Sequence, residues 1–408
     1  MEENCDVLII GGGPSGSIAA CKLLKAGFSV TILEKLEFPR FVIGESLLPK
    51  CNEVLESIGI LDVIKEQGFM LKPGAIFIDE NKIEEIIDFR DNLGQKCNTS
   101  FQVKREEFDN VLLQTAIKLG ADVRHKVEVI DYDNEKNIIY AQDENGVKSS
   151  FKARFVLDAS GYGRVLPQLL NLDEPSDLKL RNAILTRMTG ETRRDKENEG
   201  FIDIVIHDDN KAWFWGIPFS DGVTSIGIVC EENYFLDTGL SKEEFLLKAI
   251  NSHKYLKEKY KNAKQVAPVR IINGYSASIK KMYGKGFAMS GNATEFLDPV
   301  FSSGVTLALE SSSRVASLII DELNGKEVDW QKDYEDYMMM GINVFREFVY
   351  AWYSGKLRKI FYAKNKSKQI KQSIASILSG YVWDKNNYFV KNTKQRIDAL
   401  VEMSESQN

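Results

Sequence analysis

A glycine-rich segment near the N-terminus, GGGPSG, is the first group of residues with a clear chemical use. It fits the pattern G-x-G-x-x-G, in which Gly11 permits a sharp turn and Gly13 lets the backbone approach a pyrophosphate. Gly16 lets the following helix pack closely against the preceding strand, and the N-terminus of that helix attracts an anion. The segment therefore predicts a site for a dinucleotide.

Such a site needs a strand before the glycines and a helix after them. Val7–Ile10 and Val30–Leu33 are continuous apolar runs, as in strands that are buried on both faces. Between them, Ser15–Leu24 is rich in small and apolar residues and predicts a helix that ends before Gly27. Glu34 follows the second strand, where a carboxylate accepts hydrogen bonds from ribose hydroxyls. The segment is therefore expected to be a βαβ unit.

Composition excludes several other kinds of protein. The chain has 408 residues, of which 43% are hydrophobic and 27% charged, as is ordinary for two or three packed units. Its net charge of -6 and the lack of a nucleic-acid-reading motif argue against a nucleic acid partner. Five cysteines and three histidines are scattered, so we expect no metal site and a reducing compartment. No apolar run suits a signal peptide or a membrane span, and we expect a cytoplasmic protein.

Two later segments also have a strand followed by a turn of small residues. Phe151–Asp158 runs into Ala-Ser-Gly, and Gly286–Ser290 runs into Gly-Asn, with Pro299 shortly behind. They resemble the later FAD motifs of the flavoproteins that include p-hydroxybenzoate hydroxylase, geranylgeranyl reductases and flavin-dependent halogenases. The resemblance implies that FAD, held non-covalently, is the dinucleotide. Asn292 stands where the group usually has aspartate, so this hydroxyl contact carries no charge and weaker flavin binding is expected.

Four short motifs narrow the resemblance to the flavin-dependent halogenases, especially those that act on phenols and carrier-bound pyrroles. The motifs are GESLLP at residues 44–49, KPGAIF at 72–77, WFWGIP at 213–218 and DPVFSSGV at 298–305. WFWGIP matches the halogenase motif W-x-W-x-I-P at every fixed position. The resemblance covers about residues 5–325, which is most of the chain.

The resemblance implies three catalytic residues. In these halogenases reduced FAD and oxygen form a flavin hydroperoxide, chloride attacks it, and hypochlorous acid travels to a separate lysine. Lys72 matches that lysine, whose amine would polarise hypochlorous acid or form a chloramine. Trp213 and Trp215 point to one face of a strand and would separate flavin from substrate. Phe301 replaces the glutamate of tryptophan halogenases, which disfavours a tryptophan substrate; a surface lysine and ordinary core tryptophans are the alternative interpretations.

A larger set of residues is implied around FAD. Arg105 begins a helix predicted over Arg105–Leu119 and matches a flavin-contacting arginine, but a solvated charge at a helix start fits the sequence equally well. Ser303 and Gly304 open a further helix, whose N-terminus would face the flavin and favour an anion. Besides the three fingerprint glycines and Glu34, the predicted cofactor-binding residues are Pro14, Ser15, Lys35, Arg40, Ser46, Arg105, Val129, Asp158, Ala159, Gly161, Gly291, Asn292, Pro299, Ser303, Gly304 and Val305.

The predicted fold class is α/β: a Rossmann-like FAD-binding domain with an inserted antiparallel β-sheet substrate domain and a helical C-terminal region. Period-2 alternation in Phe201–Ile206 and Thr224–Val229 indicates the sheet, and the aromatic-rich chain after residue 330 has helical spacing. We expect the FAD-binding domain to comprise residues 1–74, 104–174 and 271–330, the substrate domain residues 75–103 and 175–270, and the helical region residues 331–408.

These features predict an FAD-dependent oxidoreductase of the monooxygenase type. A halogenase that modifies a phenolic, pyrrolic or polyene substrate, free or carrier-bound, is the favoured interpretation. An alkene reductase like the geranylgeranyl reductases, an aromatic hydroxylase and a non-catalytic flavin-binding module are the alternatives. Because only one dinucleotide fingerprint is present, NAD(P)H must bind transiently or a separate flavin reductase must supply reduced FAD.

The C-terminal region contains a basic stretch without any acidic residue, from Gly355 to Gln372. In an acidic chain this asymmetry predicts a basic face. A solvated surface, adhesion to an anionic membrane and docking of an acyl carrier protein are three interpretations that the sequence leaves open. The basic residues are Lys356, Arg358, Lys359, Lys364, Lys366, Lys368 and Lys371.

Overall fold

The first βαβ unit confirms the N-terminal prediction. The computed structural model describes residues 2–363 and 365–405, and in it β1 (Glu2–Ile10) and β2 (Val30–Glu34) pair in parallel with α1 (Pro14–Lys25) between them. The last four residues of β1 and all of β2 are buried, as in strands covered on both faces. A Cβ at position 16 would lie 2.0 Å from the carbonyl oxygen of Gly11, so only glycine permits this approach of helix and turn.

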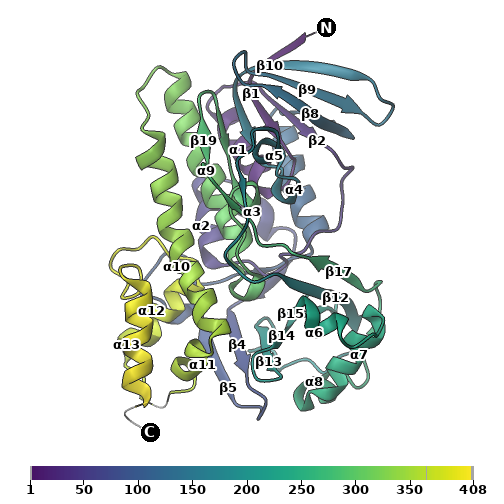
Figure 1. Cartoon of the computed structure of the whole chain (residues 1–408), viewed down its shortest axis with the longest axis vertical. Coiled ribbons are helices and arrows are strands. Elements are labelled where there is room, and N and C mark those ends of the chain that lie inside the picture. Colours follow the sequence, from purple (N-terminus) through teal and green to yellow (C-terminus); the bar gives the residue numbers. More distant parts are fainter. Residues whose placement is uncertain (1, 364, 406–408) are drawn as a thin grey trace.

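This unit belongs to an eight-stranded sheet in the upper half of Figure 1. Its central order is β19–β20–β10–β1–β2–β7, and β20, β10, β1, β2 and β7 are parallel to one another. Helix α1 packs between α9 (Ser303–Leu323) and α4 (Arg105–Lys118). The other strands are β7 (Asp122–His125), β8 (Val127–Asp133), β9 (Ile138–Asp143), β10 (Lys148–Asp158), β19 (Tyr283–Gly284) and β20 (Phe287–Met289). The carboxyl ends of the parallel strands meet at one edge, where a ligand site is expected.

A second eight-stranded sheet has the order β16–β12–β15–β14–β13–β4–β5, with β17 also paired to β12. Its pairs are antiparallel, as predicted, except that β4 and β13 are parallel. The strands are β4 (Gly74–Ile78), β5 (Glu84–Asp88), β12 (Arg181–Thr189), β13 (Ile202–His207), β14 (Ala212–Pro218), β15 (Val223–Glu231), β16 (Lys264–Gln265) and β17 (Arg270–Asn273). Strands from two distant stretches of chain therefore build one sheet.

Successive side chains along these strands point alternately into two buried cores, rather than into one core and the solvent. On β14, Trp213 and Trp215 belong to the core shared with the first sheet. Phe214 belongs to a second core, which α7 (Lys242–Ser252) and α8 (Lys254–Lys259) cover. The period-2 prediction of strands was correct, and both faces of the sheet are buried because helices cover the far side.

Shorter elements complete the two sheet-based units. β3 (Met70–Lys72) pairs with β6 (Ser100–Gln102) in a separate two-stranded sheet, so residues 100–102 are not part of the large second sheet. This small sheet ends at Lys72 beside α2 (Pro49–Ser57). The remaining elements are α3 (Leu61–Lys65), α5 (Val165–Leu169), α6 (Glu232–Leu236), β11 (Asp173–Glu174), β18 (Ser278–Ile279) and 3-10 turns at Phe89–Asp91, Gly161–Gly163, Gly291–Ala293 and Pro299–Phe301.

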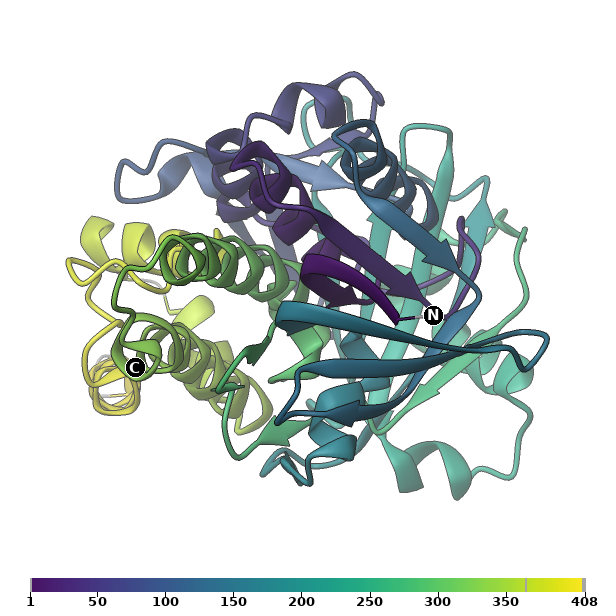
Figure 2. The ribbon, with the colours of Figure 1, turned by 90° about the horizontal axis from the view of Figure 1, so that it is seen from above.

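The C-terminal helices connect the two units along one side of the molecule (Figures 1 and 2). Several of their aromatic residues are core: Trp352 of α10 (Asp336–Tyr353) contacts Phe77 of the second sheet and Phe301 of the turn before α9. In the described part of the chain, no helix is long and apolar enough to span a bilayer. After a π-helical turn at Gln331–Glu335 come α10 (Asp336–Tyr353), α11 (Lys356–Phe361), α12 (Lys368–Leu378) and α13 (Thr393–Glu405).

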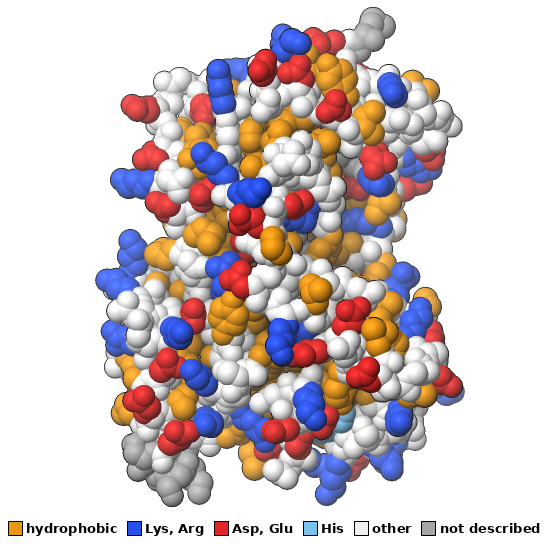
Figure 3. Space-filling model, in the orientation of Figure 1, with side chains coloured by type: hydrophobic (Ala, Val, Ile, Leu, Met, Phe, Trp, Pro, Cys, Tyr) orange, Lys and Arg blue, Asp and Glu red, His pale blue; other side chains and the backbone are white. Residues whose placement is uncertain are grey.

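The basic stretch after residue 355 is not the continuous free basic face that we predicted. Acidic side chains from distant segments pair with four of its cations, and Figure 3 shows both signs of charge interspersed over the lower part of the molecule. Lys368 and Lys371 are exposed, and Lys364 lies outside the described residues. The pairs are Lys356 with Asp398, Arg358 with Asp209, Lys359 with Glu405 and Lys366 with Glu85. Most of the stretch therefore stabilises the fold locally.

Trp215 lies flat against Gly227 on the neighbouring strand, and this contact yields a test of the packing. A Cβ at position 227 would be 2.3 Å from the indole carbon Cζ2. We expect Gly227→Ala to displace Trp215 and lower the free energy of unfolding by about 1–3 kcal/mol, measured by urea unfolding of the apoprotein. Gly163→Ala is the control, since its Cβ would meet nothing closer than 3.4 Å. Equal stabilities of the Gly227→Ala variant and wild type would contradict this contact.

Candidate active site

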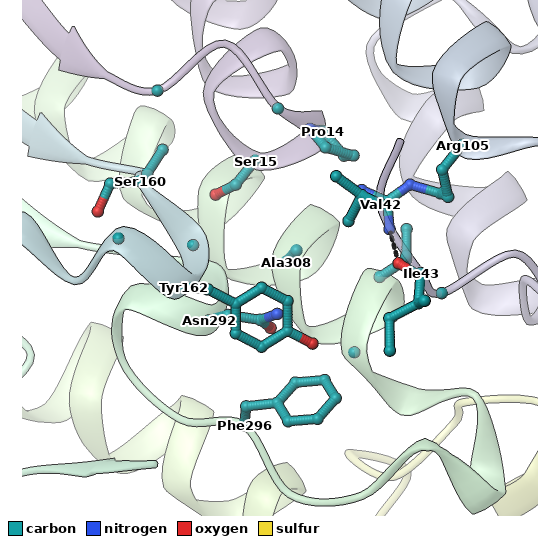
Figure 4. Close-up of a pocket in the computed structure, with 18 of the residues that line it drawn as sticks. Pro14, Ser15, Val42, Ile43, Arg105, Ser160, Tyr162, Asn292, Phe296 and Ala308 are labelled. Carbon is teal, nitrogen blue, oxygen red and sulfur yellow. Dashed lines mark hydrogen bonds between the residues drawn. The ribbon is translucent and has the colours of Figure 1, made fainter. Parts of the chain in front are cut away.

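A pocket of about 640 Å³ opens at the carboxyl edge of the first sheet. The first βαβ unit, the start of α4, the turn after β10 and the N-terminus of α9 form its wall (Figure 4). The second sheet contributes both predicted tryptophans. The predicted site residues that line it are Gly11, Gly13, Pro14, Ser15, Glu34, Lys35, Arg40, Ser46, Arg105, Val129, Ala159, Gly161, Trp213, Trp215, Asn292, Pro299, Gly304 and Val305. Segments far apart in sequence thus converge on one cavity.

Five predicted site residues lie behind this wall rather than in it. Asp158 is fully buried, and its carboxylate accepts the backbone N–H groups of Ser160 at 2.8 Å and Leu166 at 2.7 Å. It orders the turn that carries the pocket-lining residues and does not itself face the cavity. The five residues are Gly16, Lys72, Asp158, Gly291 and Ser303.

The wall has the features that a dinucleotide requires. A Cβ at Gly11 would lie 2.6 Å from the carbonyl oxygen of Ala159, and the N-terminus of α1 begins at Gly13. The Glu34 carboxylate accepts the N–H of Gly12 at 2.8 Å, which holds it at the end of β2. Ser46 Oγ is buried in the wall without a hydrogen-bond partner in the described part of the chain. Tight glycine turns, a helix N-terminus and an unpartnered hydroxyl all fit FAD.

Two arginines in the wall are held by one carboxylate that the sequence analysis missed. Asp109 is fully buried and accepts both Arg105 Nε at 2.7 Å and an Arg40 Nη at 2.9 Å. Arg105 also donates to the carbonyl oxygen of Ile43 at 2.6 Å, drawn as the dashed line in Figure 4. Because Arg105 is only 6% exposed, its interpretation as a solvated charge is wrong. The i, i+4 spacing of Arg105 and Asp109 was the available sequence signal.

Several apolar and aromatic residues in the wall had no sequence signal. Tyr162 and Phe296 lie edge to face across the pocket, with ring centroids 5.4 Å apart (Figure 4). Val42 and Ile43 come from the irregular chain between β2 and α2, where no periodicity exists to mark them. They narrow the cavity and make part of its surface apolar, as a flavin ring requires.

The two tryptophans form the part of the wall that the second sheet supplies. Their ring centroids are 6.0 Å apart, and both side chains are buried. Trp213 Nε1 donates to the hydroxyl of Tyr353 at 3.0 Å, and Trp215 Nε1 donates to Ser225 Oγ at 3.2 Å. Since each indole has a polar anchor and also lines the pocket, the pair is more than sheet core.

Lys72 is buried beside the pocket, so its interpretation as a surface lysine is wrong. It is 1% exposed, and its Nζ lies 3.4 Å from the hydroxyl of Ser302, which lines the pocket. Burial lowers the pKa of its ammonium group from 10.5 to about 7, and the nearby thiol of Cys51 opposes this only in part. The described residues place no carboxylate in an ion pair with Lys72. A lysine held this way is partly neutral at pH 7 and can act as a nucleophile or a hydrogen-bond donor.

Comparison with known proteins agrees with this geometry. The family model described as FAD binding domain matches residues 4–336. A 1H-pyrrole-2-carbonyl-(peptidyl-carrier protein) chlorinase of Pseudomonas fluorescens is 31% identical, and the match covers 98% of this chain and 94% of the relative. The chain belongs to the flavin-dependent halogenases. This family member is therefore an FAD-dependent enzyme of the monooxygenase type, as predicted.

Two further relatives widen the comparison. A 1H-pyrrole-2-carbonyl-(peptidyl-carrier protein) brominase of Pseudoalteromonas luteoviolacea is 27% identical to this halogenase family member, over 94% of this chain and 93% of the relative. The crystal structure of a flavoprotein/dehydrogenase from Cytophaga hutchinsonii has a TM-score of 0.94 and 43% identity, over 99% of this chain and 100% of that chain. The α/β fold agrees with that of the structural relative, and the FAD cofactor agrees with the matching family model.

Replacement of Gly13 tests the position of the cofactor. Among the described residues, a Cβ at Gly13 would come close only to the end of the Arg40 side chain, and Gly13 itself lines the pocket. We expect Gly13→Val to abolish FAD uptake because its side chain would occupy the pyrophosphate position. Equilibrium dialysis and flavin absorbance measure the uptake. Ala26→Val, at the exposed opposite end of α1, should bind FAD like wild type, and normal uptake by Gly13→Val would place the cofactor elsewhere.

The buried lysine also predicts a pH-dependent stability. Above about pH 7 Lys72 is deprotonated in the folded protein but protonated in the unfolded chain up to about pH 10.5, so the unfolded state binds more protons. Wild type should therefore gain stability relative to Lys72→Met by up to about 1.4 kcal/mol per pH unit across this window, and not below it. Urea unfolding measures this difference. Lys65→Met, at an exposed lysine, is the control. A difference between wild type and Lys72→Met that does not change across this window would disprove the burial.

Proposed function

We propose that the protein halogenates an electron-rich aromatic acyl group, such as a pyrrole, that a carrier protein presents as a thioester. The buried amine of Lys72 next to the pocket wall is the single observation that carries this proposal. Two relatives that match nearly the whole chain are named as a chlorinase and a brominase of a carrier-bound pyrrole, which supports the substrate class. The thioester carrier is accordingly proposed as a partner.

The tryptophan wall supports a reaction away from the flavin. Trp213 and Trp215 close the pocket towards the second sheet, so an aromatic substrate does not stack on FAD there. When bound in its reduced form, FAD would activate molecular oxygen, which is the oxidant that converts a halide ion into hypohalous acid. A small oxidant, unlike an aromatic ring, passes through a narrow gap, and Lys72 lies behind Ser302 in the position to receive it.

Lys72 then activates hypohalous acid in one of two ways. Its neutral amine attacks the halogen of hypohalous acid, so that an N–halogen bond forms, the O–halogen bond breaks and the departing hydroxide takes the amine proton to give water. Alternatively its ammonium form donates a hydrogen bond to the oxygen of hypohalous acid and polarises the O–halogen bond. A pKa of about 7 makes both forms abundant at neutral pH.

The start of α9 is proposed to hold the halide or the negative charge of the reduced flavin. Ser302 has a left-handed backbone with φ of 56°, which turns the chain so that the unpaired amides of α9 face the pocket. These amides and the helix dipole favour an anion. Phe301 beside them is packed against Phe348 and Trp352, so this position carries no carboxylate to orient a tryptophan substrate.

We also propose a source of electrons and a location for the protein. A separate flavin reductase or transient NAD(P)H supplies the electrons, since the sequence has a single dinucleotide fingerprint. A cytoplasmic location is supported by five cysteines that are all free thiols. Alkene reduction is a second candidate function, because a structural relative at 43% identity is described as a flavoprotein/dehydrogenase.

Substitution of the lysine tests the proposal. With reduced FAD, chloride or bromide and a carrier-bound pyrrole-2-carboxyl thioester, Lys72→Ala should lose about 100-fold or more of the halogenated product. Oxidation of reduced FAD and release of hydrogen peroxide should stay at the wild-type rate, because Lys72 lies outside the FAD pocket. Mass spectrometry of the carrier measures the product, and Lys65→Ala is the control at an exposed lysine.

The wild-type reaction decides between the candidate functions. Failure of wild type to add halide to any carrier-bound or free phenolic or pyrrolic compound would refute halogenation. Anaerobic oxidation of reduced FAD coupled to saturation of an alkene would establish the reductase instead. Equal halogenation of free and carrier-bound pyrrole would remove the carrier protein from the proposal while leaving Lys72 in it.

A further inference from the structure

A second cavity, of about 780 Å³, lies between the second sheet and the end of α10. Its wall includes Arg181 at the start of β12 and Tyr353, the last residue of α10. Trp213, which lines the FAD pocket, donates its indole N–H to the Tyr353 hydroxyl at 3.0 Å. A pair of hydrogen-bonded aromatic side chains, one in each wall, therefore lies between the two cavities.

A buried carboxylate holds Tyr353 in turn. The Tyr353 hydroxyl donates to Asp298 Oδ2 at 2.8 Å, and Asp298 is 2% exposed. This hydroxyl thus accepts from the indole and donates to the carboxylate, so its hydrogen bonds fix the position of both partners. Trp213 Nε1 is left with no other hydrogen-bond acceptor among the described residues.

Charged and polar groups from several elements face this carboxylate. The guanidinium of Arg181 lies 3.4 Å above the ring centroid of Tyr353, and the hydroxyl of Tyr275 lies 3.5 Å from Asp298 Oδ2. Burial raises the pKa of Asp298 to about 6, although Arg181 and the hydrogen bonds act in the opposite direction. At neutral pH the carboxylate is charged and its hydrogen bonds are at full strength.

We infer that Tyr353 and Asp298 are positioning residues that hold Trp213 in the wall of the FAD pocket and keep this pocket closed towards the second cavity. The inference concerns the protein around FAD and holds for any substrate. Without the hydroxyl, the indole N–H has no acceptor in the protein, and a buried donor without a partner turns towards water. The second cavity, with its polar and charged lining, supplies that water.

The same carboxylate also supports the turn beside Lys72. Asp298 accepts the backbone N–H of Val300 at 3.0 Å and caps the 3-10 turn Pro299–Phe301. The next residue is Ser302, whose hydroxyl approaches Lys72 Nζ. One buried carboxylate is therefore linked both to the Trp213 indole, through Tyr353, and to the turn that carries the Ser302 hydroxyl.

Indole resonances of the apoprotein test the inference without any reaction. The chain has five tryptophans, so a proton–nitrogen correlation spectrum shows few indole signals, and Trp213→Phe identifies the relevant one. Tyr353→Phe should shift the Trp213 signal away from its hydrogen-bonded position. Tyr350→Phe is the matched control, because this hydroxyl lies one turn earlier on α10 and contacts Asp177 at the surface. An unchanged Trp213 signal in Tyr353→Phe would overturn the inference.

Titration of the same signal distinguishes positioning from simple packing. In wild type it should shift with a midpoint near pH 6 as Asp298 takes up a proton, and Asp298→Asn should remove the titration. If Asp298→Asn does not fold, the titration of Tyr353→Phe replaces it and should likewise be flat, since the link to the indole is cut. A wild-type signal that does not change between about pH 5 and about pH 7 would contradict the role of Asp298.

The loaded enzyme offers an independent readout. Tyr353→Phe should bind FAD like wild type but release about fivefold more hydrogen peroxide per product molecule, the factor that corresponds to one hydrogen bond. Tyr350→Phe should keep the wild-type ratio. A wild-type ratio in Tyr353→Phe would show that the pair of aromatic side chains does not retain the oxidant. If wild type forms no halogenated product, the proposed function fails, while the indole spectra still decide this inference.

Discussion

The close approach of the Gly11 and Gly16 backbones sets the geometry on which the whole FAD site depends. It fixes the start of α1 against the end of β1, and α1 in turn packs between α4 and α9. The N-terminus of α9 thereby comes to the same cavity as the glycine turn, and Ser302 at its start touches Lys72. The absence of side chains at Gly11 and Gly16 thus lets α1 pack in this position, and the packing of α9 against α1 in turn places Ser302 beside Lys72.

Two buried ionisable groups at the turn formed by residues 298–302 oppose folding. Lys72 has no carboxylate partner in the described part of the chain, and Asp298 has tyrosine hydroxyls as partners, one of them on the Tyr353 ring against which Arg181 stacks. Low dielectric surroundings penalise both charged forms and move both pKa values towards neutrality. Ionisable groups with shifted pKa values are characteristic of functional sites, where a loss of folding stability accompanies groups that the chemistry needs. The aromatic contacts of Phe301 with α10 hold the turn in spite of this.

Sequence reasoning succeeded where the signal is local. The glycine fingerprint, Glu34 and the period-2 pair Trp213 and Trp215 are short patterns, and all but Gly16 of them lie in the pocket wall. Their exact partners were not predictable, because Tyr353 comes from a helix some 140 positions away from Trp213. The same reason explains the error over the basic stretch: within the window no acidic residue occurs, but folding brings carboxylates such as Asp398 and Glu85 to it. Lys72 is buried among residues from other segments, such as Cys51, Phe89 and Ser302, so its burial cannot be read from KPGAIF alone.

The strand order of the first sheet has a consequence for biosynthesis. β1, which precedes the other strands of this sheet in the sequence, lies between β2 and β10, and β10 pairs on its other side with β20 at residues 287–289. The cofactor cavity is not closed until Ala308 of α9 is in place. Trp213 in its wall has its hydrogen-bond acceptor only once Tyr353 is in place. The N-terminal half therefore has no complete unit to fold on its own, unlike a chain whose domains follow one another in sequence. The complete FAD cavity therefore forms only after the chain has been synthesised as far as α10.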